Sequence, residues 1–128
     1  MSWVAPFDVH SHLAWMRLGI ALVWLLFGLL FKALGTVPRH RQICARVVGP
    51  KRAGLILWLV ALLEIVLGLW MLVGRLLPWC VGAQTVLIVA MNTLELRRAR
   101  DLLLSPVGMV LANVVFLSLG WYVALAAP

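Results

Sequence analysis

The sequence is poor in charged residues, and above all in acidic ones. Charged residues make up 12% of its 128 positions, and only four are Asp or Glu, against eleven Lys or Arg. Hydrophobic residues make up 65%, and the mean hydropathy of +1.08 is far above that of an ordinary soluble domain. This composition excludes a water-soluble globular domain and predicts an integral membrane protein in contact with the lipid bilayer.

The sequence also has few cysteines and histidines, which limits the redox and metal chemistry that we expect. Its two cysteines, Cys44 and Cys80, are far apart in the chain, whereas a thiol oxidase needs a close pair such as Cys-x-x-Cys. The three histidines, His10, His12 and His40, lie outside the apolar runs, where they cannot ligate a haem within the membrane. We predict no catalytic residue, no metal site and no cofactor of the chain's own.

The excess of basic residues gives a formal net charge of +7, which in a soluble protein would suggest nucleic-acid binding. Here most of the chain lies in apolar runs, and the Lys and Arg residues collect at the ends of these runs. Such a distribution is typical of membrane topology signals. We therefore predict no nucleic-acid partner.

Four apolar runs are long enough to cross a bilayer as helices, because about 20 helical residues span the roughly 30 Å of hydrocarbon. Helices are favoured in lipid because they satisfy their own backbone groups. The runs cover residues 13–34, 53–74, 76–96 and 106–126. We predict an all-α, single-domain integral membrane four-helix bundle with antiparallel up-and-down topology.

The basic connection 35–52 joins the first two runs. Its apolar residues recur at helical spacing between Pro38 and the pair Gly49-Pro50. This pattern predicts a short amphipathic helix on the membrane surface, where its cations would meet anionic headgroups.

The charges at the ends of the runs predict the orientation. One side holds only Arg17 and Arg75, whereas the two long connections and the run ends beside them hold nine cations. By the positive-inside rule, these connections are cytoplasmic and both termini lie outside. An aromatic belt is expected at the opposite boundary, formed by Trp3, Trp15, Trp70, Trp79 and Trp121.

Glu64 lies near the middle of the second run, where an acid costs about 2.5 to 3.5 kcal/mol and usually needs a partner. Counting residues along each run puts Arg17 and Gln84 somewhat outward of the midplane and Asn113 just inward of it. We predict a buried cluster of Arg17, Glu64, Gln84 and Asn113. In this cluster Arg17 is the expected ion-pair partner of Glu64, and the pair would fix the register of the helices. A quinone or proton site would use the same four residues.

A second polar pair is predicted near the cytoplasmic ends of the first and third runs. It consists of Lys32 and Glu95. The Arg17–Glu64 and Lys32–Glu95 pairings both follow from depth in the membrane alone. Residue counting gives this depth but not the rotation of each helix about its axis.

Several of these residues occur in short motifs that resemble the DoxX-like family over residues 13–119. The motifs are the early Arg17, Gly28-Leu-Leu-Phe-Lys32, Glu64-Ile-Val-Leu-Gly68, Asp101-Leu-Leu-Leu-Ser-Pro106 and Asn113. The resemblance implies a small four-helix bacterial membrane protein. Relatives include the membrane subunits of a thiosulfate:quinone oxidoreductase and proteins linked to membrane redox or thiol stress. Where members often carry a lysine before the final asparagine, this chain has Ala112.

Three functions remain as hypotheses. The first is an accessory or assembly subunit that packs against other membrane proteins of a larger redox complex. In the second, the chain forms a quinone pocket, with Glu64 as proton carrier and Arg17 or Gln84 bonded to a carbonyl oxygen. In the third, it is a small transporter with Glu64 as its ion site.

Overall fold

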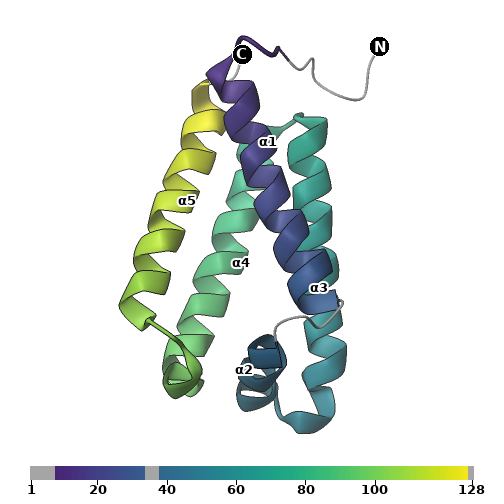
Figure 1. Ribbon diagram of the computed structural model, residues 1–128, viewed down its shortest axis with the longest axis vertical. Helices are drawn as coiled ribbons and strands as arrows, with labels where there is room; N and C mark the ends of the chain where they lie inside the picture. The colour runs from purple at the N-terminus through teal and green to yellow at the C-terminus, as the bar shows by residue number, and fades with distance from the viewer. Residues whose placement is uncertain (1–7, 34–37, 127–128) are drawn as a thin grey trace.

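The computed structural model describes residues 8–33 and 38–126, which form helices and turns without a β-strand. Four of the helical segments are long and apolar enough to cross a membrane: 12–30, 50–73, 77–98 and 106–126. In chain order the elements are α1 (His12–Leu25), the π-helix η1 (Leu26–Ala33), α2 (Pro38–Val48), α3 (Pro50–Val73), α4 (Leu77–Arg98), the 3-10 helix η2 (Arg100–Leu102) and α5 (Pro106–Ala126) (Figure 1).

Three of the sequence predictions fall on residues outside the described part of the chain. These are the end of the first run at Leu34, the start of the basic connection at residues 35–37, and Trp3 of the aromatic belt.

Prolines and glycines mark the helix ends. Pro50 stands in the first turn of α3, where its missing N–H costs nothing, and Gly74 ends that helix in the left-handed conformation at φ 75°. α5 begins at Pro106, and the Ser105 Oγ accepts a hydrogen bond from the Gly108 backbone N–H at 3.1 Å, as an N-cap does. Local sequence chemistry thus ends these helices where the connections must turn.

Small residues bring the first membrane helix close to α3. A Cβ on Gly28 would lie 2.8 Å from the Ala61 carbonyl oxygen, and a Cβ on Gly68 would lie 3.0 Å from that of Ala21. Close backbone approach at small residues is the usual basis of helix contacts in lipid. Because Gly28 meets Ala61 and the earlier Ala21 meets Gly68, the contacts run in opposite order along the two helices.

The two ends of the bundle differ in packing. The start of α1, the α3–α4 turn and the end of α5 lie at one end, whereas α2 and η2 lie at the other (Figure 1). The buried apolar cluster is concentrated toward the first end, and its members include Ala21, Met71, Cys80, Val81 and Val123. The half that contains α2 is hollow, and many large apolar side chains on the outer faces of the helices are exposed, as lipid contact requires.

Candidate ligand-binding site

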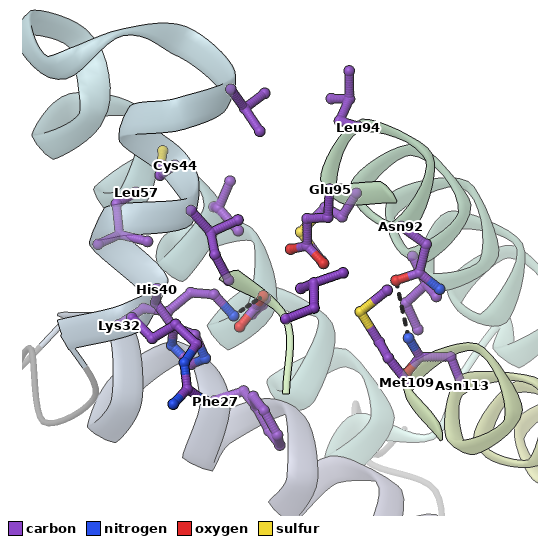
Figure 2. Close-up of a pocket in the computed structure, with 18 of the residues that line it drawn as sticks. Phe27, Lys32, His40, Cys44, Leu57, Asn92, Leu94, Glu95, Met109 and Asn113 are labelled. Carbon is purple, nitrogen blue, oxygen red and sulfur yellow. Dashed lines mark hydrogen bonds and ion pairs between the residues drawn. The ribbon is translucent and has the colours of Figure 1, made fainter. Parts of the chain in front are cut away.

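The hollow half contains a cavity of about 720 Å³, which we call the inner cavity. Its walls come from every membrane helix, from α2 and from residues 103–105. Most lining side chains are apolar, and a few polar ones converge on the same space (Figure 2). This size and this mixture are typical of small-molecule sites, which hold an apolar body and orient it through a few polar groups.

The strongest polar interaction in the inner cavity joins η1 to α3. The Lys32 Nζ donates to the Glu64 Oε1 at 2.7 Å, and the two side chains are 11% and 1% exposed. The same ammonium lies 5.4 Å from the centre of the Phe27 ring, within cation–π range. Glu64 therefore has a buried cationic partner, as a charge in this position requires.

Half of the Glu64 carboxylate remains unsatisfied. Its Oε2 is buried and has no hydrogen-bond partner among the described residues. A buried acceptor without a donor costs about 1 to 3 kcal/mol, and more when it is charged. Because Glu64 lines the inner cavity, a bound molecule with an O–H or N–H group can satisfy this oxygen.

The partner of Glu64 is Lys32, whereas the sequence suggested Arg17. The helix contacts explain the difference: Gly28 is level with Ala61 to Ile65 of α3, and Ala21 is level with Gly68. Continued along α1, this register places Arg17 about 12 Å beyond Glu64. Arg17 is a buried residue, at 8% exposure, and forms no ion pair with a carboxylate of residues 8–33 or 38–126.

Gln84 is also separate from Glu64. It is 1% exposed, and its Nε2 donates to the Cys80 Sγ at 3.3 Å within α4. Neither Gln84 nor Arg17 lines the inner cavity, whereas Glu64 and Asn113 do. The structure thus divides the four residues of the predicted cluster between the packed half and the hollow half of the bundle.

Lys32 and Glu95 line the same cavity, although the ion pair of Lys32 is with Glu64. Glu95 points into the cavity from α4, on the side facing α2 and Lys32 (Figure 2). The inner cavity therefore has two carboxylates and one lysine from three different elements.

A third polar group joins α4 to α5. The Asn113 Nδ2 donates to the Asn92 Oδ1 at 3.0 Å (Figure 2). This bond uses one donor of Asn113 and one acceptor of Asn92, so each amide retains hydrogen-bonding capacity. Asn92 was not among the predicted site residues, and its position in an otherwise apolar run is the signal that could have identified it.

The amphipathic helix α2 forms a wall of the cavity at one end of the bundle. Its Ile43 is buried, and Ile43, Cys44 and Val47 line the cavity. The sequence predicted a helix lying on the membrane surface, and an apolar stripe looks the same whether it meets lipid or protein. In the structure, part of that stripe meets the inner cavity.

Two exposed contacts hold α2 to the end of α4 and to the α4–α5 connection. The Arg98 guanidinium donates to the Val47 carbonyl at 3.3 Å, and the Arg46 Nη1 donates to the Asp101 Oδ1 at 2.7 Å. The latter hydrogen bond lowers the pKa of Asp101 below its ordinary value. The stabilisation from this contact is therefore present at neutral pH and is lost as the pH falls through the lowered pKa of the folded state.

The cysteines do not form a redox pair. Cys44 in α2 and Cys80 in α4 are both free thiols. Burial raises the pKa of the Cys44 thiol, an effect that the neighbouring Arg41 opposes, and the thiol donates to the Ala53 carbonyl at 3.5 Å. Within residues 8–33 and 38–126, no three His, Cys, Asp or Glu side chains group as metal ligands would.

A sequence model of the DoxX-like family matches residues 21–121. The matched region contains the inner-cavity residues Lys32, Glu64, Asn92, Glu95 and Asn113, whereas Arg17 precedes it. No curated protein and no solved structure matches the chain.

Proposed function

The chain belongs to the DoxX-like family, and we propose that it is a membrane subunit that binds the polar head of a quinone in its inner cavity. The observation that carries this proposal is the buried Glu64 carboxylate, held by Lys32 through one oxygen and lacking a described donor at the other. A quinone, when bound, takes up two electrons and two protons. The residues of this chain supply binding and proton transfer.

The residues of the inner cavity fit a quinone head in size and polarity. The volume of about 720 Å³ lies within the usual range for small-molecule sites, and apolar side chains such as Val60, Ile88 and Met91 can contact an uncharged ring. Lys32 and the Asn92 amide can donate hydrogen bonds to carbonyl oxygens. The Glu64 Oε2 can accept one from a hydroxyl, so the site has groups suited to both redox forms.

Glu64 is the proposed proton carrier at this site, and Lys32 holds it. The Lys32 ammonium fixes the Glu64 Oε1, which leaves the Oε2 as the oxygen available to a ligand. Glu95 is a second carboxylate on the same cavity, from α4. We propose that Glu95 exchanges protons between Glu64 and the end of the bundle where α2 lies.

Electrons for this chemistry have to come from a redox centre in another protein. We therefore propose that the chain acts as an accessory subunit of a larger membrane oxidoreductase, in which a partner's redox centre reduces the quinone. This arrangement unites the accessory and quinone-binding hypotheses, because the same chain would assemble with a partner and hold its substrate.

The proposed orientation places the inner cavity in the cytoplasmic half of the bilayer of a bacterial inner membrane. The helices would run up and down in antiparallel order, with both termini outside. In cysteine-free protein, Arg100→Cys should react with a membrane-impermeant maleimide only from the cytoplasmic side, and Arg75→Cys only from outside, because basic connections remain cytoplasmic. Labelling of intact cells and inverted vesicles measures this, and the opposite pattern would reverse the orientation.

Quinone binding can be measured through Trp24, which lines the inner cavity and is buried. The protein in lipid nanodiscs is titrated with a tail-less dimethoxy-methyl-benzoquinone while tryptophan fluorescence is recorded. We expect a saturable quenching component that disappears in Trp24→Phe. Glu64→Gln should weaken this binding by about tenfold, which corresponds to roughly 1.4 kcal/mol, because the Oε2 acceptor and the Lys32 ion pair are both altered.

Asp8→Asn is the matched control, because it makes the same carboxylate-to-amide change at an exposed position outside the cavity. It should bind as the wild type does. Quenching that rises without saturation, or that is equal in Trp24→Phe and the wild type, would mean that the quinone only partitions into lipid, and the proposal would fail.

A further inference from the structure

A second hollow lies between α4 and α5, on the outer side of the bundle. Its volume is about 240 Å³, and we call it the α4–α5 groove. Val89 and Val114, one on each wall, are each 55% exposed. The groove therefore opens outward, and in a membrane it opens into lipid. Its full lining is Ile88, Val89, Asn92, Thr93, Leu96, Val110, Asn113, Val114 and Leu117.

The groove meets the inner cavity at three shared residues. Ile88, Asn92 and Asn113 line both hollows, and the Asn113–Asn92 hydrogen bond of 3.0 Å lies at the junction. Asn113 is about 10 Å along α5 from its start at Pro106, which places the junction below the membrane surface. A molecule that extends through this junction would pass from a polar site directly into hydrocarbon.

Side chains bound the inner cavity on two other sides. Toward the packed half of the bundle, the rings of Trp24 and Phe116 lie with centroids 5.9 Å apart, and both residues line the cavity. Toward the end of the bundle, α2 places Ile43 and Val47 against the cavity. The wall between α4 and α5 is different, because three of its residues, Ile88, Asn92 and Asn113, line both the inner cavity and the groove on its outer side.

We propose that the α4–α5 groove is the subsite for the hydrocarbon tail of the ligand whose polar head occupies the inner cavity, and that the Asn92–Asn113 pair marks the point where head and tail join. This inference rests on the proposed function. A quinone of the membrane pool has both parts, an oxygen-bearing ring and a long apolar tail. The groove fits the tail because its walls are apolar apart from Thr93 and the two asparagines at the junction.

The hydrophobic effect adds little to tail binding, because a tail leaves lipid that is as apolar as the groove. The groove contributes through its shape instead. In this proposal the head of a tailed ligand binds in the inner cavity only when the tail can lie in the groove. Narrowing the groove should therefore exclude tailed ligands and spare tail-less ones. This difference separates a tail subsite from a groove that merely touches lipid.

The test compares two benzoquinones with the same dimethoxy-methyl head, one tail-less and one with a decyl tail, in the nanodisc titration. Val114→Trp narrows the groove from α5. We expect it to weaken binding of the decyl quinone at least tenfold, at matched concentration in the membrane, and to change that of the tail-less quinone less than twofold. Val115→Trp is the control, since Val115 is the next residue of α5, is 60% exposed and does not line the groove.

A second pair of variants tests the other wall. Val89→Trp narrows the groove from α4 and should repeat the selective effect, whereas Val86→Trp, at a position 71% exposed and outside the groove, should not. Unchanged binding of the decyl quinone in Val114→Trp and Val89→Trp, or equal loss of both quinones in both variants, would overturn the tail subsite. If the wild type bound neither quinone, the proposed function itself would fail.

Discussion

Replacing Lys32 by methionine is expected to lower the free energy of unfolding by about 3 to 5 kcal/mol, the usual cost of removing one partner from a buried ion pair. Methionine retains much of the length of the lysine chain but removes the ammonium that contacts the Glu64 Oε1 at 2.7 Å. Glu64, at 1% exposure, would then be a buried carboxylate without its cation. Unfolding in mixed micelles, followed by circular dichroism, measures the loss.

Two further variants show whether the loss of stability in Lys32→Met comes from breaking the Lys32–Glu64 ion pair. Lys32→Met combined with Glu64→Leu should recover most of the stability, because replacing both charges of a buried pair with apolar groups is often close to neutral. Lys51→Met removes an exposed cation at the start of α3 and should change stability little. A double variant as unstable as Lys32→Met alone would contradict the ion-pair account.

Replacing Gly28 by alanine is expected to destabilise the protein by about 1 to 3 kcal/mol, because overpacking a close contact forces the backbones apart. The new Cβ would lie 2.8 Å from the Ala61 carbonyl oxygen and 3.0 Å from the Glu64 Cβ. The first of these neighbours is backbone and cannot move aside alone. Separating η1 from α3 would also strain the Lys32–Glu64 pair, so quinone binding should weaken as well.

Gly19→Ala provides the control in the same membrane-spanning segment. A Cβ on Gly19 would have no neighbouring atom within 4 Å, so alanine there should be neutral or slightly stabilising, because alanine favours the helical state over glycine. Thermal unfolding of the two variants side by side makes the comparison. Equal midpoints for Gly28→Ala and Gly19→Ala would show that the first membrane helix and α3 do not approach each other at Gly28.

The fold was largely predictable, because a segment that crosses the bilayer has a set length and must hydrogen-bond its own backbone groups. These two requirements leave few alternatives to long helices. The four apolar runs correspond to four long helices, and Ser105-Pro106 begins α5 as its capping chemistry predicted. The antiparallel order and the sides of the membrane on which the termini lie remain predictions. The position of α2 over the inner cavity was not predictable from its amphipathic pattern, because that pattern does not distinguish lipid from protein.

The candidate site was harder to predict because it depends on helix register. Glu64 was identified from the free-energy cost of placing a carboxylate in lipid. Residue counting, however, treated each run as centred on the membrane midplane and so favoured Arg17 as the partner of Glu64. The register comes instead from small residues with equal spacing, Ala21 and Gly28 on one helix and Ala61 and Gly68 on the other. Matching these spacings brings Gly28 to Ala61 and places Lys32 one turn further, on the side of Ala61 away from Glu64. Helical side chains lean toward the N-terminus of their own helix. Because the contacts run in opposite order along the two helices, Lys32 and Glu64 lean toward each other and meet, whereas Arg17 leans away from Glu64.

The most direct measurement of quinone binding is photolabelling of the protein in nanodiscs with an azido-benzoquinone, followed by mapping of the adducts by mass spectrometry. We expect adducts on residues that line the inner cavity from three elements, such as Ile43, Val60 and Met91, and their loss in Glu64→Gln. Adducts spread over lipid-facing residues such as Leu62 and Val86, with no change in Glu64→Gln, would contradict a quinone site in this bundle.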